Sequence, residues 1–134
     1  HVAMWMKFLF ITVWSGLGAV TRAPLGIWSS LPETRHMAES ALQEIISVAQ
    51  ARDVGLPENA MPTIMNMYDS LPPDITSSMQ RDIAEGRPSE LDAQIGAVVR
   101  LGEETDVATP LHKFIYDTLL PAELRARGQL QFGE

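Results

Sequence analysis

The residue with the most distinctive chemistry is Lys7, an amine set inside the apolar segment from Met4 to Val20. A lysine near a helix end can extend its amine to water or pair with a carboxylate, and Lys7 taken alone favours this structural interpretation. A lysine held in a cleft can instead donate a proton or bind an anion, because burial makes its charge depend on its surroundings. Both interpretations stay open at this point.

A second group of polar residues covers Thr76–Asp82 and Gly86–Asp92. Ser77 or Ser78 can cap one helix and Ser89 the next, since a hydroxyl accepts a hydrogen bond from a free amide of the first turn. Glu90 and Asp92 suit the first turn of a helix because the helix dipole favours negative charge there. From the residues alone, helix capping is favoured over a binding site.

Other kinds of site have little support in this sequence. The histidines are His1, His36 and His112, and none has metal-ligand spacing with another ligand, so we expect surface or boundary positions for His36 and His112. The absence of cysteine excludes disulfides and thiolate metal sites. A formal charge of −7, from 10 Lys and Arg against 17 Asp and Glu, disfavours nucleic-acid binding.

The elements that must position these residues are predicted to be helices, within one domain over residues 1–134. The segment Met4–Val20 is apolar on nearly all sides, which is typical of a central helix, and Pro24 prevents its continuation. The further helices are expected over Pro32–Arg52, Glu58–Ser70, Thr76–Glu85, Glu90–Glu104 and Thr109–Leu120. Residues 121–134 are expected to form a tail, with at most a turn or short helix over Glu123–Gly128.

The apolar first segment permits other interpretations. It resembles the start of a signal peptide, and Arg22 ends an uncharged run of about 14 residues, short of the ~18–20 that a membrane span needs. Phe8–Trp14 is a weak strand candidate, and Gly16-Leu17-Gly18 approaches a dinucleotide-binding loop. Thr21 replaces the third glycine, and Pro24 would break the helix that should meet the phosphates. We expect a buried core helix and no membrane association.

The order of the motifs resembles the C-terminal domain of the ketopantoate reductase (2-dehydropantoate 2-reductase) family. The motifs are Trp5-Met6-Lys7, Ser77-Ser78-Met79-Gln80-Arg81-Asp82, Gly86-Arg87-Pro88-Ser89-Glu90-Leu91-Asp92, Gly96-Ala97-Val98-Val99 and Thr109-Pro110. Each motif alone is weak, but the set covers about Trp5 to Leu120 in the family's order.

The resemblance implies an all-α bundle of the 6-phosphogluconate dehydrogenase C-terminal type, without the N-terminal Rossmann domain of the family. It implies an NADPH-dependent oxidoreductase that converts a 2-keto acid to a 2-hydroxy acid, in pantothenate biosynthesis if the substrate is ketopantoate. NADP would be bound mainly by the absent domain, so the isolated chain is expected to be inactive. The implied location is the cytoplasm.

The resemblance also implies roles for individual residues. Lys7 would be the catalytic acid, Glu90 would support binding and catalysis, and Ser78 and Ser15 would contact the substrate. We therefore expect Lys7, Ser78 and Glu90 to converge on one cleft. The family usually carries asparagines where this chain has Ile11 and Ser15. Because Ile11 cannot form a hydrogen bond, another 2-keto acid, another ketone or a lost activity stays open.

The alternative function is a non-enzymatic helical module for dimerisation or interaction. Trp14, Trp28 and the methionines Met61, Met65 and Met67 could form an exposed apolar surface. Ordinary core filling is the favoured interpretation of the methionines. The sequence leaves the oligomeric state, including a homodimer, open.

Overall fold

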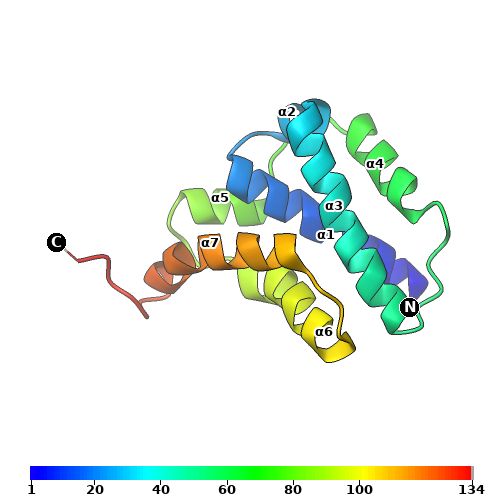
Figure 1. The fold of residues 1–134 in the computed structure, drawn as a ribbon. Helices are drawn as coiled ribbons and strands as arrows, with labels where there is room; N and C mark the ends of the chain where they lie inside the picture. The colour runs from blue at the N-terminus through cyan, green and yellow to red at the C-terminus, as the bar shows by residue number, and fades with distance from the viewer. Residues whose placement is uncertain (134) are drawn as a thin grey trace.

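The computed structural model describes residues 1–133, which form helices and contain no strand (Figure 1). The helices are α1 (Val2–Thr21), α2 (Leu25–Ser30), α3 (Pro32–Ala51), α4 (Ala60–Ser70), α5 (Ser78–Ala84), the π-helix η1 (Asp92–Gly96), α6 (Ala97–Thr105) and α7 (Pro110–Ala126). The predicted all-α class is confirmed. The strand interpretation of Phe8–Trp14 is wrong, because this segment lies inside α1.

Helix α1 is the centre of the molecule and contacts α2, α3, α4, α5, η1 and α7 (Figure 1). Leu9, Val13 and Leu17 recur every four residues and are fully buried, as the helical period requires. By length and composition alone α1 could cross a membrane, but half of its most apolar window is buried against other helices. A core helix meets the same criteria, so the packing explains its apolar character.

Two hydrophobic cores hold the helices together. The larger one lies mainly among α1, α2, α3 and α4, and it includes Trp28 and Met65. The smaller one joins the end of α1 to α5, η1 and α7 through Ala19, Met79, Leu91, Ile95, Ile115 and Leu119. This second core matters for function because it carries the segments that contain Ser78 and Glu90.

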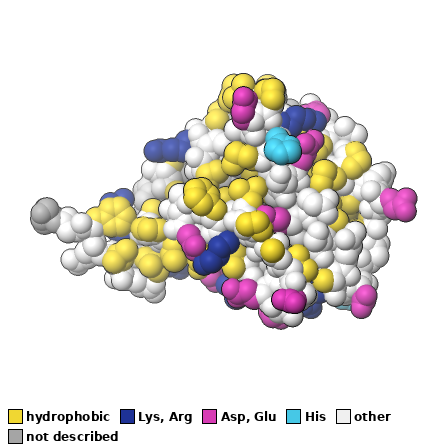
Figure 2. All heavy atoms as spheres, in the orientation of Figure 1, with side chains coloured by type: hydrophobic (Ala, Val, Ile, Leu, Met, Phe, Trp, Pro, Cys, Tyr) yellow, Lys and Arg dark blue, Asp and Glu magenta, His cyan; other side chains and the backbone are white. Residues whose placement is uncertain are grey.

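Only part of the aromatic and methionine set lies at the surface. Trp28 and Met65 are buried, Trp14 and Met61 are half-buried, and Met67 is exposed. Figure 2 shows apolar side chains dispersed among charged ones on the face it presents. The large apolar side chains that are exposed are Val2, Met4, Ile27, Leu31, Met67, Phe114, Leu130 and Phe132.

Two helix boundaries differ from the prediction. A short helix, α2, follows Pro24 where no helix was predicted, and α7 continues through Pro121 to Ala126. Pro121 has no amide hydrogen and therefore leaves the carbonyl of Asp117 without its usual donor. The helix persists because Leu119 and Glu123, on either side of the proline, are both buried.

His112 also differs from the expected boundary position, since it is fully buried near the start of α7. Its Nδ1 lies 2.7 Å from Oε1 of Glu44 on α3. Glu44 further accepts the backbone amides of Leu111 at 2.8 Å and His112 at 3.0 Å. A side chain of α3 thus satisfies two of the free amides at the N-terminus of α7, as a helix cap does. His36 is exposed, as expected.

Candidate functional site

Lys7 lies in the second turn of α1 and is exposed, which agrees with the structural interpretation of a lysine that extends its amine to water. Consecutive helical residues differ by 100°, and Lys7 therefore lies about 200° around the axis from both Trp5 and Leu9. Those two residues face the core, which leaves Lys7 on the opposite side. Among the described residues the amine of Lys7 has no hydrogen-bond or ion-pair partner. The amine can therefore bind a ligand.

Helix α1 becomes more deeply buried along the face of Lys7. Ile11 is half-buried and Ser15 is 2% exposed, at intervals of four residues from Lys7. Beyond them a Cβ added to Gly18 would lie 2.2 Å from the side-chain oxygen of Gln80 on α5. One helix face thus runs from an exposed amine into the contact with α5.

This geometry excludes the interpretation of Gly16 and Gly18 as a phosphate-binding loop. Both glycines lie well inside α1, where backbone amides are bonded within the helix and cannot bind phosphates. A Cβ on Gly16 would lie 3.0 Å from Ile95, so its small size permits close helix packing. The described residues around this motif do not fit the pyrophosphate of a dinucleotide.

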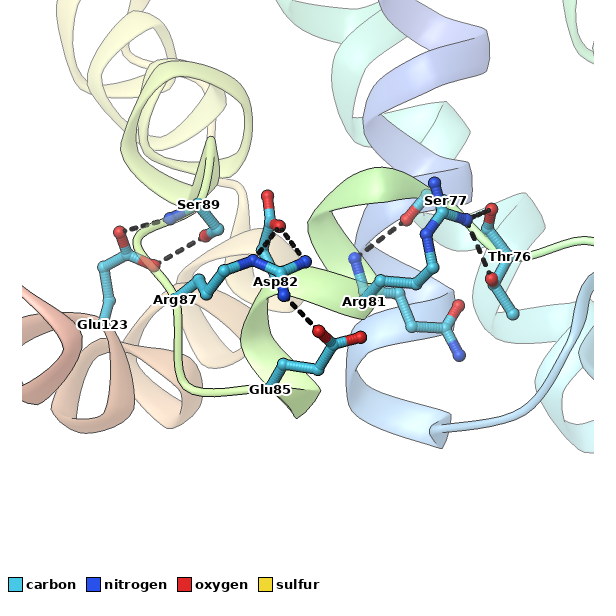
Figure 3. A network of polar contacts seen from close by, with 9 residues as sticks. Thr76, Ser77, Arg81, Asp82, Glu85, Arg87, Ser89 and Glu123 are labelled. Carbon is cyan, nitrogen blue, oxygen red and sulfur yellow. Dashed lines mark hydrogen bonds and ion pairs between the residues drawn. The ribbon is translucent and has the colours of Figure 1, made fainter.

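The adjacent serines at the start of α5 have different surroundings. Ser77 is buried and its hydroxyl accepts the amide of Gln80 at 3.0 Å, which makes it the N-cap of α5 (Figure 3). Ser78 is the first residue of the helix and is exposed, and none of the hydrogen bonds found over residues 1–133 uses its hydroxyl. Ser77 is therefore the cap, and the hydroxyl of Ser78 is left for another partner.

These differences predict separate effects of two matched substitutions. Ser77→Ala is expected to destabilise the chain by about 1 kcal/mol because α5 loses its cap. Ser78→Ala is expected to change stability by less than about 0.5 kcal/mol, since an exposed hydroxyl without a partner is removed. Urea unfolding followed by circular dichroism measures both. Equal losses of stability in the two variants would contradict this assignment of the cap.

The turn after α5 explains the Gly-Arg part of the sequence motif. Gly86 has a φ of 73°, its amide donates to Ile83, and the amide of Arg87 donates to the carbonyl of Asp82 at 2.8 Å. This left-handed helix end favours glycine. The Arg87 guanidinium bonds Oδ1 of Asp82 at 2.9 and 3.1 Å and also pairs with Glu85 (Figure 3). The chain is thereby directed from α5 into the segment of Glu90.

Glu90 follows this turn and is exposed. It lines a hollow of about 410 Å³ together with Tyr116, Glu123 and Arg127. The predicted helix over Glu90–Glu104 begins with the π-helix η1, a distortion that often occurs at functional sites. Asp92, the first residue of η1, accepts bonds at 3.0 Å from Arg100 and from the hydroxyl of Tyr116.

The structure brings the segments of the predicted site onto one domain but does not join the residues themselves. Within residues 1–133 no hydrogen bond or ion pair links Lys7, Ser78 and Glu90, so their convergence on one ligand stays a prediction. Ser15 is buried, and no hydrogen bond of its hydroxyl is found in this range. The residues that sequence reasoning missed are Glu123 and Arg127, whose spacing of four within a helix is a typical ion-pair signal.

Comparisons with known proteins agree with this architecture. The family model described as "Ketopantoate reductase PanE/ApbA C terminal" matches residues 2–123. A 2-dehydropantoate 2-reductase of Pyrobaculum aerophilum is 30% identical over 119 residues, which are 89% of this chain and 42% of that protein.

Solved structures of similar proteins superpose closely on this chain. A dimeric ketopantoate reductase from Staphylococcus aureus has a TM-score of 0.86 and 29% identity, covering 93% of this chain and 44% of that one. A 2-dehydropantoate 2-reductase from Methylococcus capsulatus has a TM-score of 0.84 and 27% identity, covering 99% of this chain and 42% of that one. The chain spans less than half the length of these relatives. Because the family model matches residues 2–123, the chain belongs to the ketopantoate reductase family and corresponds to the C-terminal domain of that family.

Proposed function

We propose that this chain is the substrate-side part of an NADP-dependent oxidoreductase that reduces a 2-keto acid to a 2-hydroxy acid. The observation that carries the proposal is the family match over residues 2–123. The proposal gives Lys7, in the Trp5-Met6-Lys7 motif, the role of the family's lysine. Because the segment of Gly16 and Gly18 does not fit a dinucleotide, the proposal assigns NADP to a further, N-terminal domain. A cytoplasmic location and assembly as a homodimer are parts of the same proposal.

The chemistry explains the residue types. Reduction adds a hydride from the nicotinamide to the ketone carbon, and the carbonyl oxygen then gains negative charge and takes up a proton. An ammonium group beside that oxygen stabilises the charge and donates the proton. The exposed, unpaired amine of Lys7 suits this task once a substrate and a covering domain exclude water around it.

The other proposed residues bind the substrate. The hydroxyl of Ser78 is not used by the cap of α5 and can donate to the substrate carboxylate. Glu90 is proposed to contact the substrate from the segment before η1, and a carboxylate near Lys7 also favours the protonated amine. Ser15 is proposed to support this face of α1. Ile11 removes one hydrogen-bonding position, which favours a 2-keto acid other than ketopantoate.

The test compares the 134-residue chain alone with a longer protein in which the proposed N-terminal NADP-binding domain precedes it. Titration of the chain with NADPH, followed by nucleotide fluorescence, should show no binding in the micromolar range. The longer protein should oxidise NADPH with at least one member of a 2-keto acid panel. Micromolar binding by the chain alone would refute the assignment of NADP to another domain. Failure of the longer protein to oxidise NADPH with any keto acid or ketone would refute the proposed reaction.

A further inference from the structure

Glu123 is an acid that the proposed chemistry does not use, although it is only 4% exposed. Its Oε1 accepts the hydroxyl of Ser89 at 2.6 Å, and its Oε2 accepts the backbone amide of Ser89 at 2.9 Å (Figure 3). Oε2 also receives Nε of Arg127 at 2.8 Å. A buried carboxylate is strongly unfavourable unless it is paired and hydrogen-bonded, and here both oxygens have partners.

Arg127 completes the attachment of Ser89. Its Nη2 donates to the carbonyl oxygen of Ser89 at 2.9 Å, while the hydroxyl of Ser89 accepts the amide of Leu91 at 3.2 Å. The amide, the carbonyl and the hydroxyl of Ser89 are therefore all bonded. Glu123 of α7 and Arg127, the residue directly after α7, hold Ser89, which lies 34 and 38 positions earlier in the chain. We call Glu123, Arg127 and Ser89 the α7 clamp.

The α7 clamp lies directly before Glu90 in the chain. Ser89 on one side is bonded at every polar group, and Leu91 on the other side is fully buried in the smaller core. The carbonyl of Glu90 accepts the amide of Gln94 at 3.0 Å. The backbone of Glu90 is thus held on both sides, while its side chain stays exposed and lines the 410 Å³ hollow. The π-helix η1 follows this segment directly.

We infer that Glu123 and Arg127 are positioning residues, which fix the backbone of Glu90 for the reaction of the longer enzyme. The inference rests on the proposed function. Glu123 is assigned no contact with the substrate and acts through Ser89. Small displacements of a binding group can reduce the rate about a hundredfold, so loss of the α7 clamp should be visible in kinetics as well as in stability.

The main experiment is a double-mutant cycle in the longer enzyme. Glu123→Gln is expected to lower kcat/KM for the keto acid by about tenfold to a hundredfold at temperatures where the variant stays folded. In a Glu90→Gln background the same substitution should change kcat/KM by less than about twofold, because the group that it positions is already lost. If the losses of kcat/KM from Glu123→Gln and Glu90→Gln multiplied in the double variant, the inference would be overturned. A Glu123→Gln enzyme with lower thermal stability but unchanged kcat/KM would also overturn it.

The chain offers matched controls for this cycle. Arg125 lies two residues before Arg127 on α7, and its guanidinium stacks on Phe132 at 3.8 Å without touching Ser89. Arg127→Met should reproduce part of the Glu123→Gln effect, whereas Arg125→Met should leave kcat/KM within about twofold of the wild type. Ser89→Ala provides a milder change if Glu123→Gln fails to fold, and we expect an intermediate loss from it. Equal losses in the two arginine variants would count against the α7 clamp.

Amide hydrogen exchange on the 134-residue chain separates failure of the inference from failure of the proposed function. Glu123→Gln should accelerate exchange of the Ser89 and Leu91 amides at least tenfold, with unchanged exchange in α3. Uniform acceleration would overturn the α7 clamp whatever the reaction. If the wild-type longer enzyme oxidises no NADPH, the proposed function fails and the inferred catalytic role falls with it. If the wild type is active and Glu123→Gln is equally active, only the inference fails.

Discussion

Replacement of Lys7 by methionine is expected to lower kcat of the longer enzyme for its keto acid by about 10²- to 10⁴-fold, the usual contribution of a positioned proton donor. Methionine has a similar length but cannot donate a proton or stabilise an oxyanion. Stability should change by less than about 0.5 kcal/mol, because Lys7 is exposed and has no partner among residues 1–133. Steady-state kinetics with NADPH absorbance, together with a urea unfolding curve, measures both effects.

The sequence contains one matched control, since its two lysines are Lys7 and Lys113. Lys113 is exposed and pairs with Asp117 at 3.0 Å on the surface of α7. Lys113→Met removes the same charge and should leave kcat within about twofold, because surface ion pairs contribute little. If Lys7→Met retained wild-type kcat, the role of Lys7 as the acid would be wrong and the reductase proposal would lose its central residue.

The largest expected effect on stability comes from Glu44 on α3. Glu44→Ala should reduce the free energy of unfolding by about 2–4 kcal/mol, because it leaves two amides of α7 and the buried His112 without their shared acceptor. Urea unfolding at pH 7 measures this loss. Glu103→Ala is the control, since Glu103 is exposed and its replacement should cost less than about 0.5 kcal/mol. Equal losses of unfolding free energy in the two variants would contradict a stabilising role of the hydrogen bonds between Glu44 and the start of α7.

The same contact predicts a dependence of stability on pH. Burial by itself raises the pKa of Glu44, but hydrogen bonds from the His112 side chain and from the amides of Leu111 and His112 outweigh it, so the pKa lies below its ordinary value. Since the folded pKa is lower than the unfolded one, the carboxylate stabilises the fold above the unfolded pKa. This stabilisation is lost as the pH falls through the folded pKa. Unfolding free energies measured from pH 7 to pH 3 should therefore fall less steeply for Glu44→Gln than for the wild type, and parallel curves would contradict the assignment.

Local sequence signals determined most of the fold. Pro24 and Pro110 mark a helix end and a helix start, Gly86 provides the left-handed residue after α5, and the apolar character of Met4–Val20 indicated a central helix. These features depend on backbone geometry and on spacing along one helix, so they could be predicted from neighbouring residues alone. The order of the motifs indicated the family for the same reason, because each motif is a local feature.

Only the tertiary structure decided which side chains are buried and which residues they then contact. Lys7 is surrounded by apolar residues in sequence yet exposed, because the helix turns them toward the core and Lys7 away from it. His112 and Glu123 read as surface residues but are buried, because α3 and the segment of Ser89 cover them from far away in the chain. Burial and pairing depend on segments that meet only after folding, and no local period encodes those contacts. The α7 clamp on Glu90 is therefore a property of the folded domain.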